Sequence, residues 1–281
     1  MGADASSVAV GPHPWEDQQD QARTAGRLRR LILFVLVAFL NIATFMVCFQ
    51  LYKIVRRTYI QRGQRVGYHH ADQIIHLEKK LHLFFEIRLQ HWLLDRPDTV
   101  IMLVNRWYSF FMWSFFICCI VAMARAPEQY RRLRRVFLLT MVIALPWYAI
   151  YPLAPPRFIT GEGFIDTALV YGPHYLSGKG MITANRYAAM PSMHVGWTTI
   201  GACMLAVSFR RRWIGIPLGA TLLTAMCLTV MVTGNHWFLD LIGGWLIVLA
   251  AFGVERLLPE RIEFPWFRQR EKQKMGTPAQ G

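Results

Sequence analysis

The hydrophobic residues of this chain form long runs separated by short polar segments. Six runs are long enough, or nearly so, to cross a bilayer as helices with a rise of about 1.5 Å per residue. They extend over about Leu31 to Leu51, Val100 to Ala124, Val136 to Leu153, Met193 to Phe209, Trp213 to Thr233 and Trp237 to Leu258. The pattern predicts an all-α fold, a polytopic membrane helical bundle with about six transmembrane helices.

A different pattern occupies the segment from Asp72 to Arg96, between the first two runs. Its charged residues are too frequent for a span, but its apolar residues recur at helical spacing. We therefore expect one amphipathic helix at the membrane interface. Lys79, His82, Glu86 and Gln90 form its polar stripe, which is either simply solvated or contacts the headgroup of a substrate.

The two ends of the chain lack such patterns. Residues 1–30 contain no apolar core of a signal peptide and predict a disordered cytosolic tail. Residues 31–258 form the predicted membrane-embedded domain, and residues 259–281 a second cytosolic tail.

Composition and charge agree with a membrane protein. Hydrophobic residues make up 54% of the chain, and the formal net charge is +14. The basic residues stand in short clusters between apolar runs, which argues against a continuous groove for nucleic acid. If the N-terminus is cytoplasmic, more than half of the 31 Lys and Arg residues lie on the cytoplasmic side. Both termini are then cytoplasmic, and Arg157, His194 and His236 lie at the outer face of the cell membrane.

The five cysteines carry no recognisable framework. Each lies inside an apolar run, without the spacing of metal ligands, so we expect neither a disulfide framework nor a zinc site. They are Cys48, Cys118, Cys119, Cys203 and Cys227.

Two histidines and an aspartate stand at the ends of the last apolar runs. His236 and Asp240 are four residues apart, so they lie on one face if the segment after Asn235 is helical, with Asn235 as the N-cap. His194 follows Pro191 by three residues, and proline is favoured in the first turn of a helix. The backbone N–H groups near His194 would then form an anion-binding helix end. We expect the two helix starts to converge on one phosphate.

This set of residues suits phosphoryl transfer without a metal ion or other cofactor. Such a reaction needs a nucleophile, groups that hold the phosphate oxygens, and an acid for the leaving oxygen. We assign His236, oriented by Asp240, as the nucleophile and His194 as the acid. Arg157 offers a guanidinium to the phosphate, and Ser192 with neighbouring N–H groups completes its binding. Each residue alone could be an ordinary interfacial side chain. Their predicted placement on the same side of the membrane favours an active site instead.

Three segments carry a family resemblance. YPLAPPRF, MPSMHVGW and TGNHWFLDLIGG resemble, in this order, the signature motifs of the type 2 phosphatidic acid phosphatase superfamily. Together with EKKLHLFFEIRLQ they are most similar to the branch that includes the inositol phosphorylceramide synthases. The resemblance covers about Asp72 to Gly244. It implies that His194 is the acid, that His236 forms a phosphohistidine, that Asp240 is its partner and that Arg157 binds phosphate.

Two positions depart from the superfamily pattern. Where its first motif has a lysine this chain has Ile150, and where its third motif has an arginine this chain has Val230. Lys179 and Arg186, in the loop before the second motif, are the candidates to replace these phosphate ligands.

We therefore predict a membrane lipid phosphatase that uses a lipid phosphate or phospholipid as substrate and water as acceptor. The alternative is a phosphotransferase with the same residues, similar to an inositol phosphorylceramide synthase, that passes a phosphoryl or phosphoalcohol group to a polyol or lipid hydroxyl. A transporter or an inactive scaffold is the third reading, but the sequence shows no internal repeat or broken spans.

Overall fold

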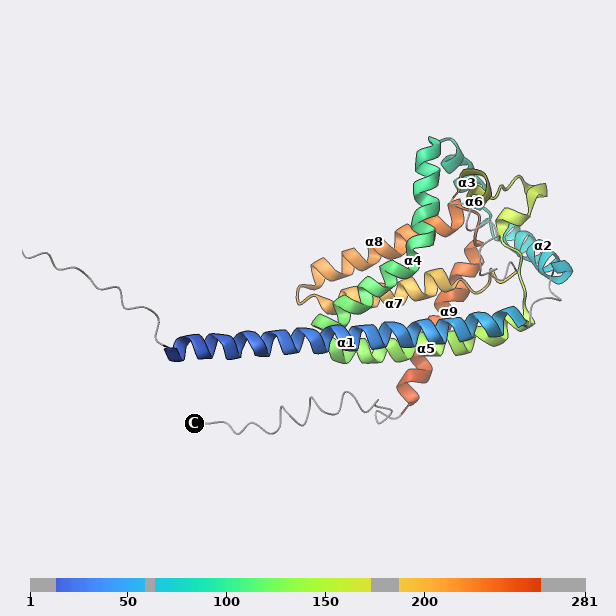
Figure 1. The fold of residues 1–281 in the computed structure, drawn as a ribbon. Helices are drawn as coiled ribbons and strands as arrows, with labels where there is room; N and C mark the ends of the chain where they lie inside the picture. The colour runs from blue at the N-terminus through green and yellow to red at the C-terminus, as the bar shows by residue number, and fades with distance from the viewer. Residues whose placement is uncertain (1–13, 59–63, 173–186, 259–281) are drawn as a thin grey trace, which may run out of the picture. The chain divides into compact units, whose positions relative to one another are not determined.

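The computed structural model describes residues 14–58, 64–172 and 187–258, and the regular elements in these ranges are helices (Figure 1). The all-α prediction is thus confirmed. Within the described ranges, the β-type pairing is an isolated bridge between Leu153 and Ala188. The α-helices are α1 Pro14–Thr58, α2 Gln64–Lys80, α3 Glu86–Leu94, α4 Asp98–Arg125, α5 Pro127–Ile150, α6 Thr167–Tyr171, α7 Met193–Ser208, α8 Arg212–Val232 and α9 Phe238–Leu257; two 3-10 turns are η1 Pro156–Phe158 and η2 Thr160–Glu162.

The chain divides into two compact units between Val47 and Cys48. The described part of the first unit is a single helix, the beginning of α1, which starts at Pro14 and thus earlier than the expected Leu31. Proline suits a first helical turn, and the following Gln, Glu, Ala and Arg residues favour helix. Residues 1–13 and 259–281, the ends of the predicted tails, lie outside the described residues.

Five of the described helical segments are long and apolar enough to cross a membrane: Arg23–Ile54 within α1, and α4, α5, α8 and α9. The sixth predicted span is α7, which has only 16 residues. At about 1.5 Å per residue it extends about 24 Å, less than the hydrocarbon core of about 30 Å. It lies among α4, α5, α8 and α9 instead of facing lipid along its length.

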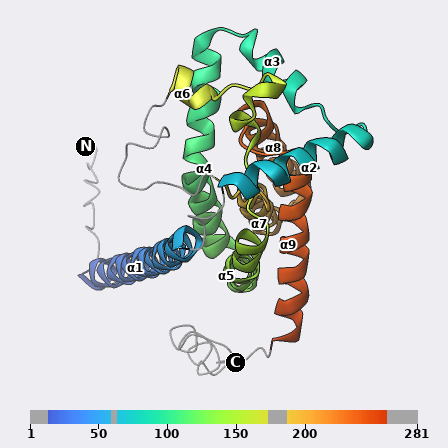
Figure 2. The ribbon, with the colours of Figure 1, turned by 90° about the vertical axis from the view of Figure 1, so that its right-hand side faces the viewer.

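Small residues bring the helices close to α7. Gly219 of α8 packs on the backbone of Ala202, where a Cβ would lie 2.7 Å from the carbonyl oxygen. Gly196 of α7 and Gly244 of α9 form a second close contact. Such contacts are typical of membrane helices, which associate through backbone approach. Figure 1 shows α7 and α8 side by side and α9 crossing α7 and α5 obliquely, and Figure 2 shows α5 and α7 nearly end-on beside α9.

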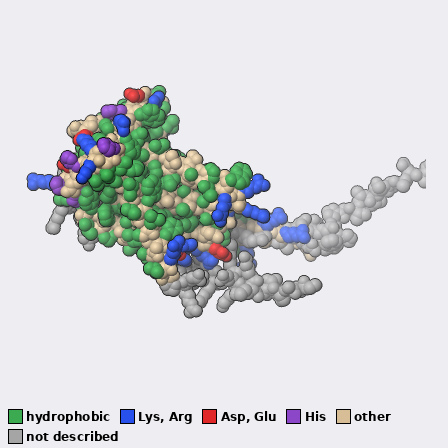
Figure 3. Space-filling view, turned by 180° about the vertical axis from the view of Figure 1, so that it is seen from behind, with side chains coloured by type: hydrophobic (Ala, Val, Ile, Leu, Met, Phe, Trp, Pro, Cys, Tyr) green, Lys and Arg blue, Asp and Glu red, His purple; other side chains and the backbone are tan. Residues whose placement is uncertain are grey.

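The basic residues between the spans lie at the opposite end of α7 and α9 from the two histidines. Glu255, near the end of α9, accepts hydrogen bonds from Arg132 at 2.8 Å and Arg135 at 2.6 Å. Arg125 donates to the carbonyl of Ser208, the last residue of α7. Figure 3 shows histidine side chains gathered at the other end, over α2 and α3.

The predicted single amphipathic helix from Asp72 to Arg96 is wrong in one respect, because the chain breaks between α2 and α3. His82 adopts a left-handed conformation with φ of 59°, and the N–H of Leu83 donates to the carbonyl of Glu78. Glycine usually marks such a helix end, and its absence concealed the break. The break lets Glu78 of α2 and Glu86 of α3 both reach the start of α9, so Glu86 of the expected polar stripe is buried there. Gln90 of the same stripe is also buried, with its side-chain amide bonded to the backbone of Ile165.

Candidate active site

The start of α9 differs from the expectation. Its N-cap is Trp237, not Asn235. Gly234 adopts a left-handed turn at the end of α8, and the N–H groups of Asn235 and His236 both donate to the carbonyl of Val230. Asn235 therefore completes the end of α8, with its side chain donating to Thr233 at 2.6 Å. The turn still delivers His236 to the residue just before the new helix.

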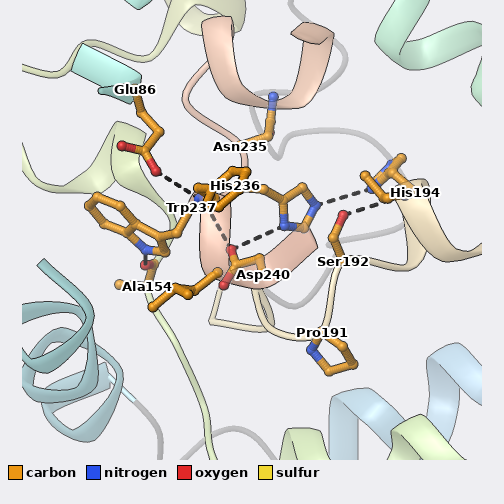
Figure 4. A network of polar contacts seen from close by, with 12 residues as sticks. Glu86, Ala154, Pro191, Ser192, His194, Asn235, His236, Trp237 and Asp240 are labelled. Carbon is orange, nitrogen blue, oxygen red and sulfur yellow. Dashed lines mark hydrogen bonds and ion pairs between the residues drawn. The ribbon is translucent and has the colours of Figure 1, made fainter. Parts of the chain in front are cut away.

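His236 and Asp240 form a buried contact. The Nδ1 atom of His236 lies 3.3 Å from the Oδ2 atom of Asp240, which also accepts the N–H of Trp237 at 2.9 Å (Figure 4). Only 5% of His236 and none of Asp240 is exposed. A carboxylate at Nδ1 fixes the tautomer that leaves Nε2 as the reactive nitrogen.

The second histidine meets that nitrogen. The Nδ1 atom of His194 lies 3.3 Å from the Nε2 atom of His236, as Figure 4 shows. Two aromatic rings of α4 contact the His194 imidazole, with centroid distances of 4.5 Å to Tyr108 and 4.7 Å to Phe111. The structure thus brings Asp240, His236 and His194 into one line.

The segment before α7 is tied to the neighbouring helices. The N–H of Ser192 donates to the backbone carbonyl of Asp240 at 2.9 Å, and the Tyr148 hydroxyl donates to the carbonyl of Pro191 at 2.8 Å. Ser192 is the N-cap of α7, with Oγ 3.5 Å from the N–H of Val195, and it is fully buried. Its hydroxyl therefore lies at the helix end expected to bind phosphate, in a capping contact.

Arg157 is near this line through its backbone. Its N–H donates to the carbonyl of Gly234, two residues before His236, at 2.9 Å. Its guanidinium Nε lies 3.5 Å from the Oδ2 atom of Asp166, and the guanidinium also lies over the Phe158 ring. The expected phosphate ligand thus has an acidic partner that the sequence did not suggest.

The other predicted phosphate ligands, Lys179 and Arg186, lie outside the described residues. At the two positions that depart from the superfamily pattern, Ile150 is 76% exposed at the end of α5, and Val230 is buried. Within the described parts of the chain, no group of three or more His, Cys, Asp or Glu side chains could hold a metal ion.

Sequence reasoning missed two acidic residues beside the site. The N–H of Phe238 donates to Glu86 at 2.7 Å, and the N–H of Leu239 donates to Glu78 at 2.9 Å. With Trp237 bonded to Asp240, the N–H groups of residues 237–239 at the start of α9 all have side-chain carboxyl partners. The expectation that this helix start binds phosphate is therefore wrong. Glu86 belonged to the predicted polar stripe, but nothing in the sequence distinguished Glu78 from its charged neighbours.

These two acids are buried, and burial raises the pKa of both. Burial and the neighbouring Glu86 raise the pKa of Glu78 to about 9. Burial likewise raises the pKa of Glu86, against the lowering effect of its backbone hydrogen bonds. Two carboxyl groups of this kind do not both ionise near neutral pH.

The arrangement as a whole has the parts of a phosphoryl-transfer centre. A buried carboxylate and imidazole supply a nucleophile, a second imidazole at hydrogen-bonding distance supplies a proton donor, and a nearby guanidinium supplies positive charge. A model of a protein family, the PAP2 superfamily, matches residues 72–254, which include all of these groups. Comparisons with curated proteins and with solved structures gave no match.

Proposed function

The chain belongs to the PAP2 superfamily of phosphoester-acting enzymes, and on this premise we propose that it is a membrane lipid phosphatase that cleaves a lipid phosphate ester through a phosphohistidine. Membership supports phosphatase or phosphotransferase activity in general. The observation that carries the proposal is the line of Asp240, His236 and His194, joined by two contacts of 3.3 Å.

The first step forms the intermediate. Nε2 of His236 attacks phosphorus while the bond to the leaving oxygen breaks, and His194 in its protonated form donates a proton to that oxygen. Asp240 stabilises the positive charge that develops on the His236 ring, because its carboxylate is in contact with Nδ1.

The second step reverses these roles. His194, now neutral, removes a proton from water as the water attacks the phosphorus of the phosphohistidine. The phosphorus–nitrogen bond breaks, inorganic phosphate leaves and His236 is restored. Microscopic reversibility assigns the acid of the first step as the base of the second.

Arg157 holds the phosphate oxygens in this scheme, with Ser192 and the N-terminus of α7 on the other side. The Arg157–Asp166 pair is partly exposed and long, at 3.5 Å. Such a pair contributes little stability, so Asp166 can release the Arg157 guanidinium to a phosphate. Lys179 and Arg186 remain predicted additional ligands. No metal ion or cofactor is part of the proposed reaction.

The proposed substrate is a lipid because the site lies at one end of a set of apolar helices. The adjacent helices α2 and α3 also expose large apolar side chains, including Leu77 and Trp92, as expected of an interfacial segment. We place this end at the outer face of the cell membrane and both termini in the cytoplasm, since the basic residues around Arg132 and Arg135 lie at the opposite end.

One observation favours the alternative, a phosphotransferase similar to an inositol phosphorylceramide synthase. Ile150 and Val230 replace two basic residues, and in the structure one faces outward and the other is buried without charge. A phosphodiester carries one negative charge where a monoester carries up to two, so it needs fewer cations. The same histidines would then pass a phosphoalcohol group to a polyol or lipid hydroxyl.

A panel of lipid phosphates and phospholipids, offered to the purified protein with and without polyols, tests both proposals. Release of free phosphate or phosphoalcohol in water, abolished by His236→Ala, supports the phosphatase. New lipid that forms only when an acceptor is present supports the transferase. No turnover of any member by a folded protein contradicts both.

A further inference from the structure

We propose that Glu78 and Glu86 are positioning residues for His236: as a buried carboxyl pair from α2 and α3, they accept backbone N–H groups of α9 and hold its first turn. The inference rests on the proposed function, because it concerns the geometry of the nucleophile. It extends the site to the α2–α3 segment, to which neither the sequence motifs nor the phosphoryl-transfer scheme assigns a part in catalysis.

The start of α9 is bound by side chains from other helices as well as its own. A helix leaves its first N–H groups without backbone partners, and one side-chain cap is the usual provision. Here Trp237, Phe238 and Leu239 donate in succession to Asp240, Glu86 and Glu78. Carboxyl groups from three helices thus bind the turn that directly follows His236.

The negative charge that the two acids would carry is only partly balanced. Glu78 and Glu86 are fully buried, and within the described residues neither forms an ion pair with a basic side chain. The helix N-terminus contributes only about half a positive charge, which does not balance two buried carboxylates beside Asp240. Burial of an unbalanced charge costs several kcal/mol, so the pair retains a proton.

The remaining carboxyl oxygens indicate where that proton lies. The Oε2 atoms of Glu78 and Glu86 are buried and accept no N–H or O–H from another residue. These unbonded Oε2 atoms are the ones that can carry the proton, and Glu78, whose ionisation its neighbours oppose, is the residue that keeps it. The charged groups that face Glu78 are Glu86 from α3 and Asp240 from α9, and both oppose its ionisation.

The residue that follows His236 is also tightly packed. Trp237 is fully buried, its Nε1 donates to the carbonyl of Ala154 at 2.9 Å, and its ring contacts Phe84 and Phe164. The first turn of α9 is therefore held both through its backbone N–H groups and through the Trp237 side chain. A misplacement of about 1 Å in a reacting group can cost about 100-fold in rate, so loosening this turn should reduce turnover without weakening substrate binding.

The test combines turnover of nitrophenyl phosphate with hydrogen exchange at the amides of residues 236–244. We expect Glu78→Ala/Glu86→Ala to lower kcat about 100-fold at similar KM and to reduce the protection of the Phe238 and Leu239 amides. Glu162→Gln, which removes an exposed ion pair with Lys79, is the matched control and should change neither. Wild-type kcat and protection in the double Ala variant would overturn the proposal.

Glu78→Gln keeps the size and the acceptor but cannot ionise, so it tests the pair even if the double variant fails to fold. In the wild type, protection of these two amides should fall above about pH 9, when Glu78 loses its proton. In Glu78→Gln it should not. An identical fall in both proteins would refute the proton on Glu78 and with it the proposal. Hydrogen exchange reports on the pair even if no phosphoester is turned over, so failure of the proposed function is separately visible.

Discussion

The Nδ1 atom of His194 and the Nε2 atom of His236 are 3.3 Å apart, close enough to share a hydrogen bond. In-line transfer places phosphorus about 3 Å from the nucleophilic nitrogen, with the leaving oxygen between phosphorus and the acid. The two rings must therefore separate when substrate binds. His236 is buried and held by Asp240, whereas His194 is partly exposed, so we expect His194 to be the ring that moves.

The two histidines should respond differently to the leaving group. His236→Ala should abolish turnover of every substrate, because His236 must attack phosphorus in each case. His194→Ala should cost about 10²- to 10⁴-fold with an alkyl phosphate, the usual value of general acid catalysis. With nitrophenyl phosphate, whose phenoxide leaves without a proton, most of this loss should disappear when single-turnover rates are measured. Rescue of His236→Ala by the activated substrate would mean that the two roles are reversed.

Asp240→Asn should resemble His236→Ala more than His194→Ala. The amide can still accept the N–H of Trp237, but it loses the charge that stabilises the imidazolium and favours the wrong tautomer of His236. We expect kcat to fall by about 10⁴-fold, with inorganic phosphate still bound in a competition assay. Rescue of Asp240→Asn by nitrophenyl phosphate would contradict the pairing.

Asp166→Asn should strengthen phosphate binding. The Asp166 carboxylate competes for Arg157, and a partly exposed pair near the surface is worth about 0.2 to 1 kcal/mol. Asparagine preserves the Oδ1 that caps α6 by accepting the N–H of Leu169. We therefore expect vanadate or phosphate to inhibit about 1.4- to 5-fold more tightly. In an Arg157→Ala background the same substitution should have no effect, and an equal gain there would show that Arg157 is not the ligand.

The raised pKa of Glu78 predicts how stability depends on pH. Between its ordinary value of 4.5 and about 9, the folded protein holds a proton that the unfolded chain has lost. This group's contribution to stability therefore falls as pH rises through that window and is level above it. Glu78→Gln should make thermal unfolding in detergent less sensitive to pH over this range. An unchanged pH slope would show that Glu78 is already ionised in the folded protein.

Cysteine labelling can test the orientation of the proposed site. Gly161 has open space around it, whereas Gly163 has a φ of 87° that disfavours any other residue. Gly161→Cys should react with an impermeant thiol reagent on intact cells, and Arg211→Cys, at the N-cap of α8, only after permeabilisation. The parent protein controls for its own five cysteines. The reverse pattern would place the histidines on the cytoplasmic side.

Local sequence patterns predicted the helices and the contact between His236 and Asp240, because both depend on residues within a few turns of each other. The break at His82 escaped prediction because a histidine takes the left-handed position where glycine is expected. Asn235 failed as an N-cap because the turn at Gly234 directs its N–H to α8.

The acidic partners of α9 escaped prediction for a different reason. Glu86 and Phe238 are 152 residues apart, and Glu78 and Leu239 are 161 residues apart. No periodicity in a single sequence relates positions at such separations. The burial of these acids follows from tertiary packing, whereas their composition and spacing suggest a solvated helix face.

These long separations also set an order of events at the ribosome. At about 5 to 20 residues per second, Glu78 and Glu86 emerge about 8 to 30 s before the helix that they bind. During this interval they lie in an interfacial segment, where water can solvate them as ordinary ionised acids. When α9 arrives, the pair takes up a proton as it is enclosed. The arrival of α9 therefore completes the end of the molecule that carries the histidines, and a nascent chain that stops before α9 leaves two acids without their partners.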